Sequence, residues 1–172
     1  MTILISYDGS DNAESAISAA ARLVGRENAS AVVLAVWEPL VVQALRAEKF
    51  GAPLLAVPND AASEDELSAR AARQLAEHGV SVAAEAGFDA RARWVADGRT
   101  IATTIIEEAD ELDADLIVMG SRGLTGISAF LGSVSNRVLQ HAHRPVLVVP
   151  AGSADRFVDA VAAGTASTPA GG

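Results

Sequence analysis

The feature that most constrains the fold is an alternation of short apolar runs with longer segments of helical period. Continuous apolar runs are typical of parallel strands that helices cover on both faces. The segments between them repeat apolar residues every three or four positions, as amphipathic helices do. The sequence therefore predicts an α/β fold with a doubly wound, five-stranded parallel sheet. The expected strands are Ile3–Tyr7, Ala31–Trp37, Ala90–Val95, Leu116–Met119 and Pro145–Val149.

Helix start and stop signals place the first two helices. Asp11 and Glu14 form a capping box for the first, and Gly25 suits its left-handed stop. Ser63 and Glu66 form a second capping box ahead of the next helical pattern. Two further helices are expected from the apolar spacing, at residues 101–112 and 133–141.

Two stretches leave alternatives open. Residues 39–62 have no clean period, and Pro53 and Pro58 break any long helix, so an excursion at the carboxyl end of the sheet is expected. Gly79 favours a break before a strand at residues 80–82. A helix that continues through Ala86 is preferred, because one strand suffices for this βαβ unit and 90–95 supplies it.

Right-handed crossovers restrict the order of the strands and the place of a ligand. The order 3-2-1-4-5 is expected, with a crevice where the order reverses, outside the carboxyl ends of the strands. The loops at that point are Asp8–Ser10 and Gly120–Gly132. Both are rich in glycine and polar residues.

The length of 172 residues indicates one domain. Residues 1–150 hold all the expected strands, and 151–172 form a tail of small residues. A short helix is possible in the tail at Phe157–Ala163, and its last residues are expected to be disordered.

A formal charge of −9 and a pI near 4.7 argue against nucleic acid or a membrane surface as the main partner. The chain has no cysteine, and its first residues lack the pattern of a signal peptide, so the expected location is cytoplasmic. No segment has the length of apolar sequence that spans a bilayer.

The acidic residues are unevenly spread. From Leu116 to Ala154 there is no Asp or Glu, and the positive or titratable side chains there are Arg122, Arg137, Arg144, His141 and His143. This composition favours a site for an anion. Alternatively, the segment is free of acids because it contains two buried strands, which need few of them.

The stretch from Gly120 to Asn136 has the features of a phosphate site. Glycines allow the backbone to approach a phosphate, and a helix that starts near Gly132 directs its unpaired N–H groups at the anion. Ser133 and Ser135 add hydroxyl donors, although Ser133 is also suited to cap the helix. The Walker A loop is excluded because the chain's one lysine is Lys49, and the dinucleotide fingerprint is absent.

The blocks ILISYDGSDNAESA and DLIVMGSRGLTG…LGSVSNRVLQHAHRPVLVVP resemble the universal stress proteins, over about residues 2 to 150. Nucleotide-binding members carry the pattern glycine, two residues, glycine, nine residues, glycine, then Ser or Thr. This chain has Gly120, Gly123 and Gly132-Ser133, with eight residues in the longer gap. The resemblance implies a Rossmann-like fold of the adenine nucleotide α-hydrolase type that binds ATP.

The resemblance also implies roles for individual residues. Asp8 and Val36 are expected beside the adenosine, as a polar contact and an apolar contact to adenine, and Met119 and Gly120 beside the ribose. The phosphates, with a magnesium ion bound through them, are expected at Gly123, Gly132, Ser133, Val134 and Ser135.

The predicted function is ATP binding by a regulatory or sensing module in the stress response, with at most slow hydrolysis. One alternative is an adenylating enzyme of the related superfamily, although YDGSDNAES lacks the expected S-G-G-x-D-S loop. Another is an interaction module of the same fold that binds no nucleotide. A homodimer through the apolar edge strand Pro145–Val149 is also expected.

Overall fold

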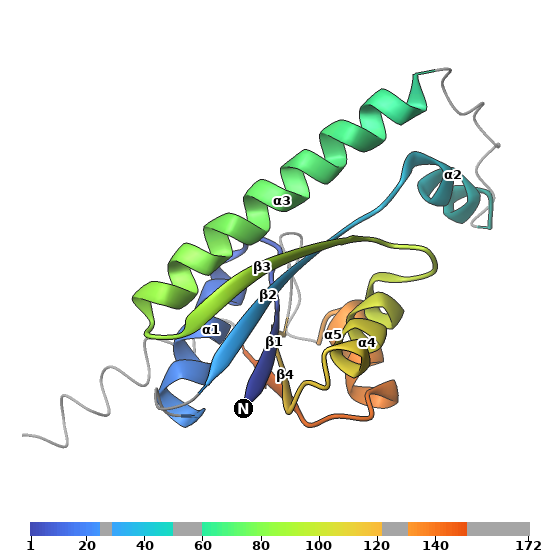
Figure 1. Ribbon diagram of the computed structural model, residues 1–172. Helices are drawn as coiled ribbons and strands as arrows, with labels where there is room; N and C mark the ends of the chain where they lie inside the picture. Colours follow the sequence, from blue (N-terminus) through green and yellow to red (C-terminus); the bar gives the residue numbers. More distant parts are fainter. Residues whose placement is uncertain (25–28, 50–59, 122–130, 151–172) are drawn as a thin grey trace, which may run out of the picture.

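The protein is built on one five-stranded parallel sheet in the order β3-β2-β1-β4-β5, which confirms the predicted architecture (Figure 1). The computed structural model describes residues 1–24, 29–49, 60–121 and 131–150. The strands are β1 (Thr2–Ser6), β2 (Ser30–Trp37), β3 (Asp89–Ala96), β4 (Leu116–Gly120) and β5 (Val146–Val149). The helices are α1 (Asp11–Val24), α2 (Leu40–Lys49), α3 (Ala61–Glu85), α4 (Ile101–Glu111) and α5 (Ser133–His141). Three predictions lie outside the described residues: the helix stop at Gly25, the loop glycine Gly123 and the tail 151–172.

Two apolar clusters lie on opposite faces of the sheet. Ile3 and Ile5 of β1 pack with α1 and α3, whereas Leu4 packs with α4 and α5. All three side chains are fully buried, as expected of a central strand that is covered on both sides. The continuous apolar run in the sequence is thus explained by burial on both faces.

The first helix begins one residue earlier than its predicted capping box implies. The Oγ of Ser10 accepts a hydrogen bond from the backbone N–H of Ala13 at 3.2 Å, so Ser10 is the N-cap and Asp11 is the first helical residue. Gly9 has a φ of +76°, a value that side chains strongly disfavour. The prediction of Asp11 as the N-cap was therefore wrong by one position.

The long helix α3 is continuous through Gly79, as preferred from the sequence. A Cβ at Gly79 would lie 2.7 Å from the Tyr7 ring and 2.7 Å from Val33, so glycine lets the helix pack closely on the sheet. The predicted capping box at Ser63 and Glu66 is wrong: Asp60 is the N-cap, without a side-chain cap hydrogen bond. The helix begins ahead of Ser63 because the backbone carbonyl of Asp60 already accepts the first helical bonds.

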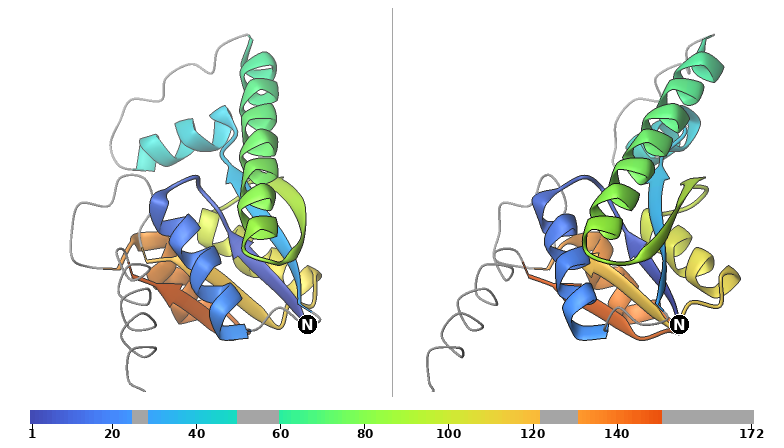
Figure 2. Two further views of the ribbon diagram at one scale, coloured as in Figure 1. Left: turned by 90° about the vertical axis from the view of Figure 1, so that its left-hand side faces the viewer. Right: turned by 60° about the vertical axis from the view of Figure 1, so that its left-hand side comes forward.

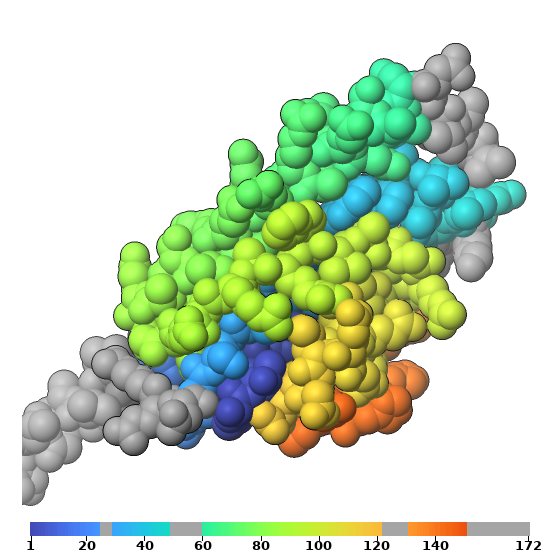
Figure 3. Space-filling view, viewed as in Figure 1, coloured from blue at the N-terminus to red at the C-terminus, as the bar shows by residue number. Residues whose placement is uncertain are grey.

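Residues 40–49 form helix α2, a short helix that the sequence did not predict within the expected excursion at residues 39–62. The two prolines that discouraged a helix, Pro53 and Pro58, follow α2 and do not interrupt it. The helix contacts the first turns of α3, where the backbone N–H of Leu40 donates to Asp65. This part of α3 projects beyond the carboxyl end of the sheet, whereas the rest of the helix packs on β2 and β3 (Figures 2 and 3). In the described part of the chain, no helix is long and apolar enough to cross a membrane.

Candidate functional site

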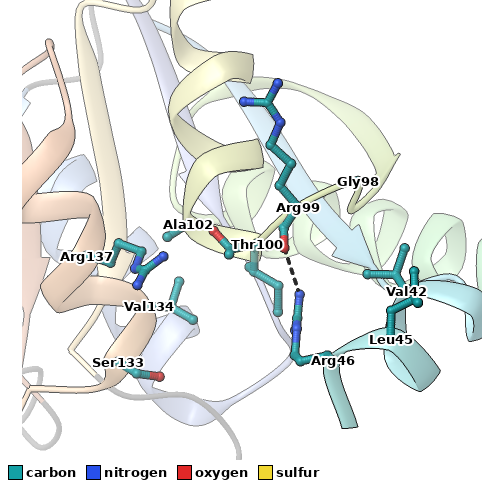
Figure 4. Close-up of a pocket in the computed structure, with 11 residues that line it drawn as sticks. Val42, Leu45, Arg46, Gly98, Arg99, Thr100, Ala102, Ser133, Val134 and Arg137 are labelled. Carbon is teal, nitrogen blue, oxygen red and sulfur yellow. Dashed lines mark hydrogen bonds between the residues drawn. The ribbon is translucent and has the colours of Figure 1, made fainter. Parts of the chain in front are cut away.

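A cavity of about 850 Å³ opens at the carboxyl end of the sheet, on the face that carries α4 and α5 (Figure 4). This volume is within the range of small-molecule sites. Its walls come from α2, the turn after β3, the start of α4 and the start of α5. The lining residues are Val42, Leu45, Arg46, Gly98, Arg99, Thr100, Ile101, Ala102, Ser133, Val134 and Arg137.

The start of α5 supplies the polar wall. Gly132 is the N-cap with extended backbone, φ −62° and ψ 156°, and among the described residues no side-chain hydrogen bond caps the helix. The Ser133 side chain is exposed, and Figure 4 shows its hydroxyl directed to the cavity. Ser133 is therefore not the helix cap, and among the described residues nothing caps its hydroxyl or the first N–H groups of α5, an arrangement that favours an anion.

The opposite wall is α2, which Arg46 fastens to the body of the protein. The Nη2 of Arg46 lies 2.9 Å from the Oδ2 of Asp97, whose side chain is fully buried, and 3.1 Å from the carbonyl oxygen of Arg99. Its Nη1 pairs with Glu38. Two carboxylates thus balance the charge of Arg46, so this arginine positions α2 beside the cavity.

Asp97 is well suited to anchor the helix because both of its oxygens are occupied. Its Oδ1 accepts hydrogen bonds from the backbone N–H of Arg99 at 2.8 Å and from Thr104 Oγ1 at 3.2 Å. Its Oδ2 accepts a hydrogen bond from the Nη2 of Arg46. A buried carboxylate with donors on both oxygens is stable only while its partners stay in place.

The two remaining arginines differ in direction. Arg137 of α5 points its guanidinium into the cavity, whereas that of Arg99 points away from it in Figure 4. The Nη1 of Arg99 lies 3.7 Å from the Oε1 of Glu107. Among the residues that the structure describes, no acidic side chain pairs with Arg137 or lines the cavity.

Three further predicted site residues, Asp8, Met119 and Gly120, lie at the carboxyl ends of β1 and β4. Asp8 Oδ1 accepts hydrogen bonds from the Oγ and the backbone N–H of Ser10, at 2.6 and 3.1 Å. A Cβ at Gly120 would lie 2.7 Å from the Asn12 amide nitrogen, so glycine is needed for α1 to approach β4. Met119 is buried in the α4/α5 cluster.

The residue before Asp8, Tyr7, is shielded from water. Tyr7 is almost completely buried, and its hydroxyl lies 3.3 Å from Glu14. Burial first, and then the negative charge of Glu14, raise the pKa of Tyr7 to about 12.

The predicted phosphate residues of α5 separate into two environments. Ser133 and Val134 line the cavity, but Ser135 is buried, and its hydroxyl donates to the carbonyl oxygens of Ser121 and Gly132, at 2.9 and 3.1 Å. Val36 is half-buried and packs on the α4/α5 cluster.

Sequence reasoning missed three contributors to this site: α2 with Arg46, the buried Asp97, and the N-cap Thr100 of α4. Away from the cavity, Glu108 of α4 is buried and pairs with Arg93. The sequence Asp97-Gly98-Arg99-Thr100 directly follows a strand, which is a usable signal for a polar turn.

The family of the chain follows from its match to a family model. The model of the universal stress protein family matches residues 1–150. This chain belongs to that family. A universal stress protein of Thermus aquaticus is 35% identical over 153 residues, which cover 86% of this chain and 97% of the relative.

Solved structures of universal stress proteins share the fold. One, crystallised in complex with cAMP, is 26% identical, with a TM-score of 0.54, and the match covers 87% of this chain and 96% of that one. Another, from Archaeoglobus fulgidus in complex with dAMP, is 23% identical, with a TM-score of 0.61 and coverage of 87% and 97%. The Rossmann-like prediction is confirmed.

Proposed function

We propose that this universal stress protein binds an adenine nucleotide, ATP with magnesium, at the cavity beside α5. The observation that supports the proposal most is the combination of an exposed helix start with a cavity whose described lining contains no acidic residue. Such a helix start favours a phosphate through its N–H groups and its dipole. The relative crystallised with cAMP supports the adenine class.

The residues present fit a phosphate chain with its metal ion. Ser133 and the first amides of α5 would hold the phosphates, and the apolar side chains of Val42, Leu45 and Val134 would face less polar parts of the ligand. In the described residues no group of three or more metal-binding side chains is found, so magnesium would be bound through the phosphates. A regulatory or sensing role in the cytoplasm remains part of the proposal.

Calorimetric titration with ATP, AMP and cAMP, each with and without magnesium, tests the proposal. Saturable binding of ATP that magnesium strengthens is the expected result. A protein that binds none of the three would instead fit an interaction module. Release of phosphate at an enzymatic rate would favour the related adenylating or hydrolytic enzymes.

The homodimer is proposed on the position of β5. This strand is at the edge of the sheet, and Val146, Leu147 and Val148 are each only partly buried. An apolar edge strand favours pairing with a second copy. Light scattering should detect particles of twice 17.6 kDa, and Val148→Lys should shift them to the monomer. Monomers of the unmodified protein at micromolar concentration would refute the dimer.

Residues 1–150 are proposed to be the functional domain, with 151–172 as a dispensable tail. The family model ends at residue 150, and β5, the last strand, ends at Val149. Deletion of 151–172 should leave the melting temperature and the affinity for ATP nearly unchanged. A large loss of either would assign the tail to the domain.

A further inference from the structure

Arg137 is a cation that faces the cavity without a carboxylate partner in the described chain. It differs in this from Arg46, which Glu38 and Asp97 neutralise, and from Arg99, which points away from the cavity. A guanidinium with no paired acid, on a wall that lacks acidic residues, favours an anionic ligand.

The position of Arg137 along α5 indicates which anion it reaches. Ser133 and Arg137 are four residues apart and line the same cavity. Residues at this spacing share one face of a helix, and a rise of about 1.5 Å per residue separates them by about 6 Å. In the nucleotide site proposed above, the first N–H groups of α5 would hold a phosphate at the helix start. Arg137 lies one turn further along the same face, a spacing that suits a second phosphate of the same ligand.

Resting on the nucleotide site proposed above, we propose that Arg137 binds a phosphate group beyond the one at the start of α5. The cavity thereby selects nucleoside di- and triphosphates over monophosphates. A guanidinium suits this task because its planar N–H groups match two phosphate oxygens at once. Arg137 is thus a specificity-determining residue, whereas the helix start itself binds mono- and polyphosphates alike.

The test measures dissociation constants of ATP, ADP and AMP for the unmodified protein and for Arg137→Gln and Arg137→Lys. Arg137→Gln should weaken ATP and ADP by about tenfold or more, the size of one charged hydrogen bond, and change AMP by less than about twofold. Arg137→Lys should recover part of the loss. Because the Arg137 side chain is exposed, the melting temperatures of all three proteins should agree.

Arg70→Gln is the matched control. Arg70 is an exposed arginine of α3, in an i,i+4 pair with Glu66 and not among the residues that line the cavity. Its removal changes the net charge equally and should leave all three affinities unchanged.

The outcomes separate this inference from the proposed function. If the unmodified protein binds ATP no tighter than AMP, or Arg137→Gln weakens both equally, Arg137 does not select polyphosphates, and the nucleotide site stands. If the unmodified protein binds none of the three, the proposed function itself fails, and the selectivity with it.

Discussion

Two regions at the carboxyl end of the sheet use the same residue types for different purposes. At the ends of β1 and β4, Asp8 is hydrogen-bonded to Ser10, and Gly120 is pressed against Asn12. At the start of α5, Gly132 has ordinary extended backbone, and Ser133 is exposed to the cavity. The first region, which we call the closed end, holds the elements together. In the second region, the Ser133 hydroxyl and the first N–H groups of α5 are the donors proposed to bind a ligand.

The difference shows that a glycine or serine in a phosphate-like pattern has no fixed role. Ser133 and Ser135 are two residues apart, yet one hydroxyl faces the cavity and the other donates to two backbone carbonyls. What separates them is burial. Substitutions at the closed end should therefore change the free energy of unfolding, and substitutions at the cavity should change affinity.

The largest expected effect is that of Gly132→Asp on binding. A carboxylate at the helix N-cap would occupy the place of a phosphate and repel it, so the affinity for ATP should fall by about a hundredfold or more. The fold should be retained, because the φ of −62° at Gly132 suits any L-residue. Calorimetry and thermal unfolding measure the two effects.

Gly132→Ala is the control for this substitution, since it adds the Cβ without the charge. It should bind ATP within a few-fold of the unmodified protein. If Gly132→Asp binds ATP as tightly as the parent, the phosphate does not lie at the start of α5.

Gly120→Ala should give the next largest effect, on stability. Its Cβ would lie 2.7 Å from Asn12 Nδ2 and 3.1 Å from the Asn12 backbone carbon, and overpacking of this kind costs about 1–3 kcal/mol. The melting temperature should fall by several degrees. Gly98→Ala is the matched control, because its Cβ would meet nothing within 4 Å. Equal melting temperatures for the two variants would contradict the close packing at Gly120.

A smaller effect should separate the two serines. Ser135→Ala removes the buried hydroxyl that joins α5 to Ser121, and should lower the free energy of unfolding by about 1 kcal/mol with little change in affinity. Ser133→Ala should weaken ATP about tenfold and leave the melting temperature unchanged. Adenosine, which lacks a phosphate, should bind both variants equally. A loss of affinity for Ser135→Ala and a loss of stability for Ser133→Ala would contradict this assignment of the two serines.

The smallest effect is the titration of Tyr7, which reports on the closed end. Tyr7 is the one tyrosine of the chain, so absorbance near 295 nm follows it alone. Its pKa of about 12 exceeds the ordinary 10.0. The raised value stabilises the folded state below pH 10, and this stabilisation is lost as the pH rises from 10 through 12. Glu14→Gln should lower the pKa, and titration near 10 in the folded protein would show that the closed end is open to water.

The strands could be predicted because β1, β2 and β4 are buried on both faces and therefore appear in the sequence as continuous apolar runs. Their order followed from the alternation of these strands with helices. Helix starts were less predictable. Asp8, Ser10 and Asp11 are neighbours of similar capping ability, and only the folded turn shows that Ser10 accepts from Ala13. Helix α2 was missed because its apolar residues have no clean period, consistent with its limited burial: Val41 and Leu45 are exposed.

The cavity itself could not be deduced from local patterns. Its α2 wall depends on the pair of Arg46 and Asp97, 51 positions apart in the chain, and no spacing rule joins two such residues. The bounds of α5 agree with the helix expected at residues 133–141, because a glycine before a serine-rich helix start is a local signal. Which serine is exposed is set by the packing of α5 on the end of β4.

The most direct test of the central claim is a titration of the ¹⁵N-labelled protein with ATP and magnesium, followed by the backbone amide signals in NMR. We predict saturable shifts at Ser133, Val134 and Thr100, with small changes at Gly79 and Ala83 in the buried part of α3. Shifts that leave the start of α5 unaffected, or no saturable shift at millimolar ATP, would contradict a nucleotide site at this cavity.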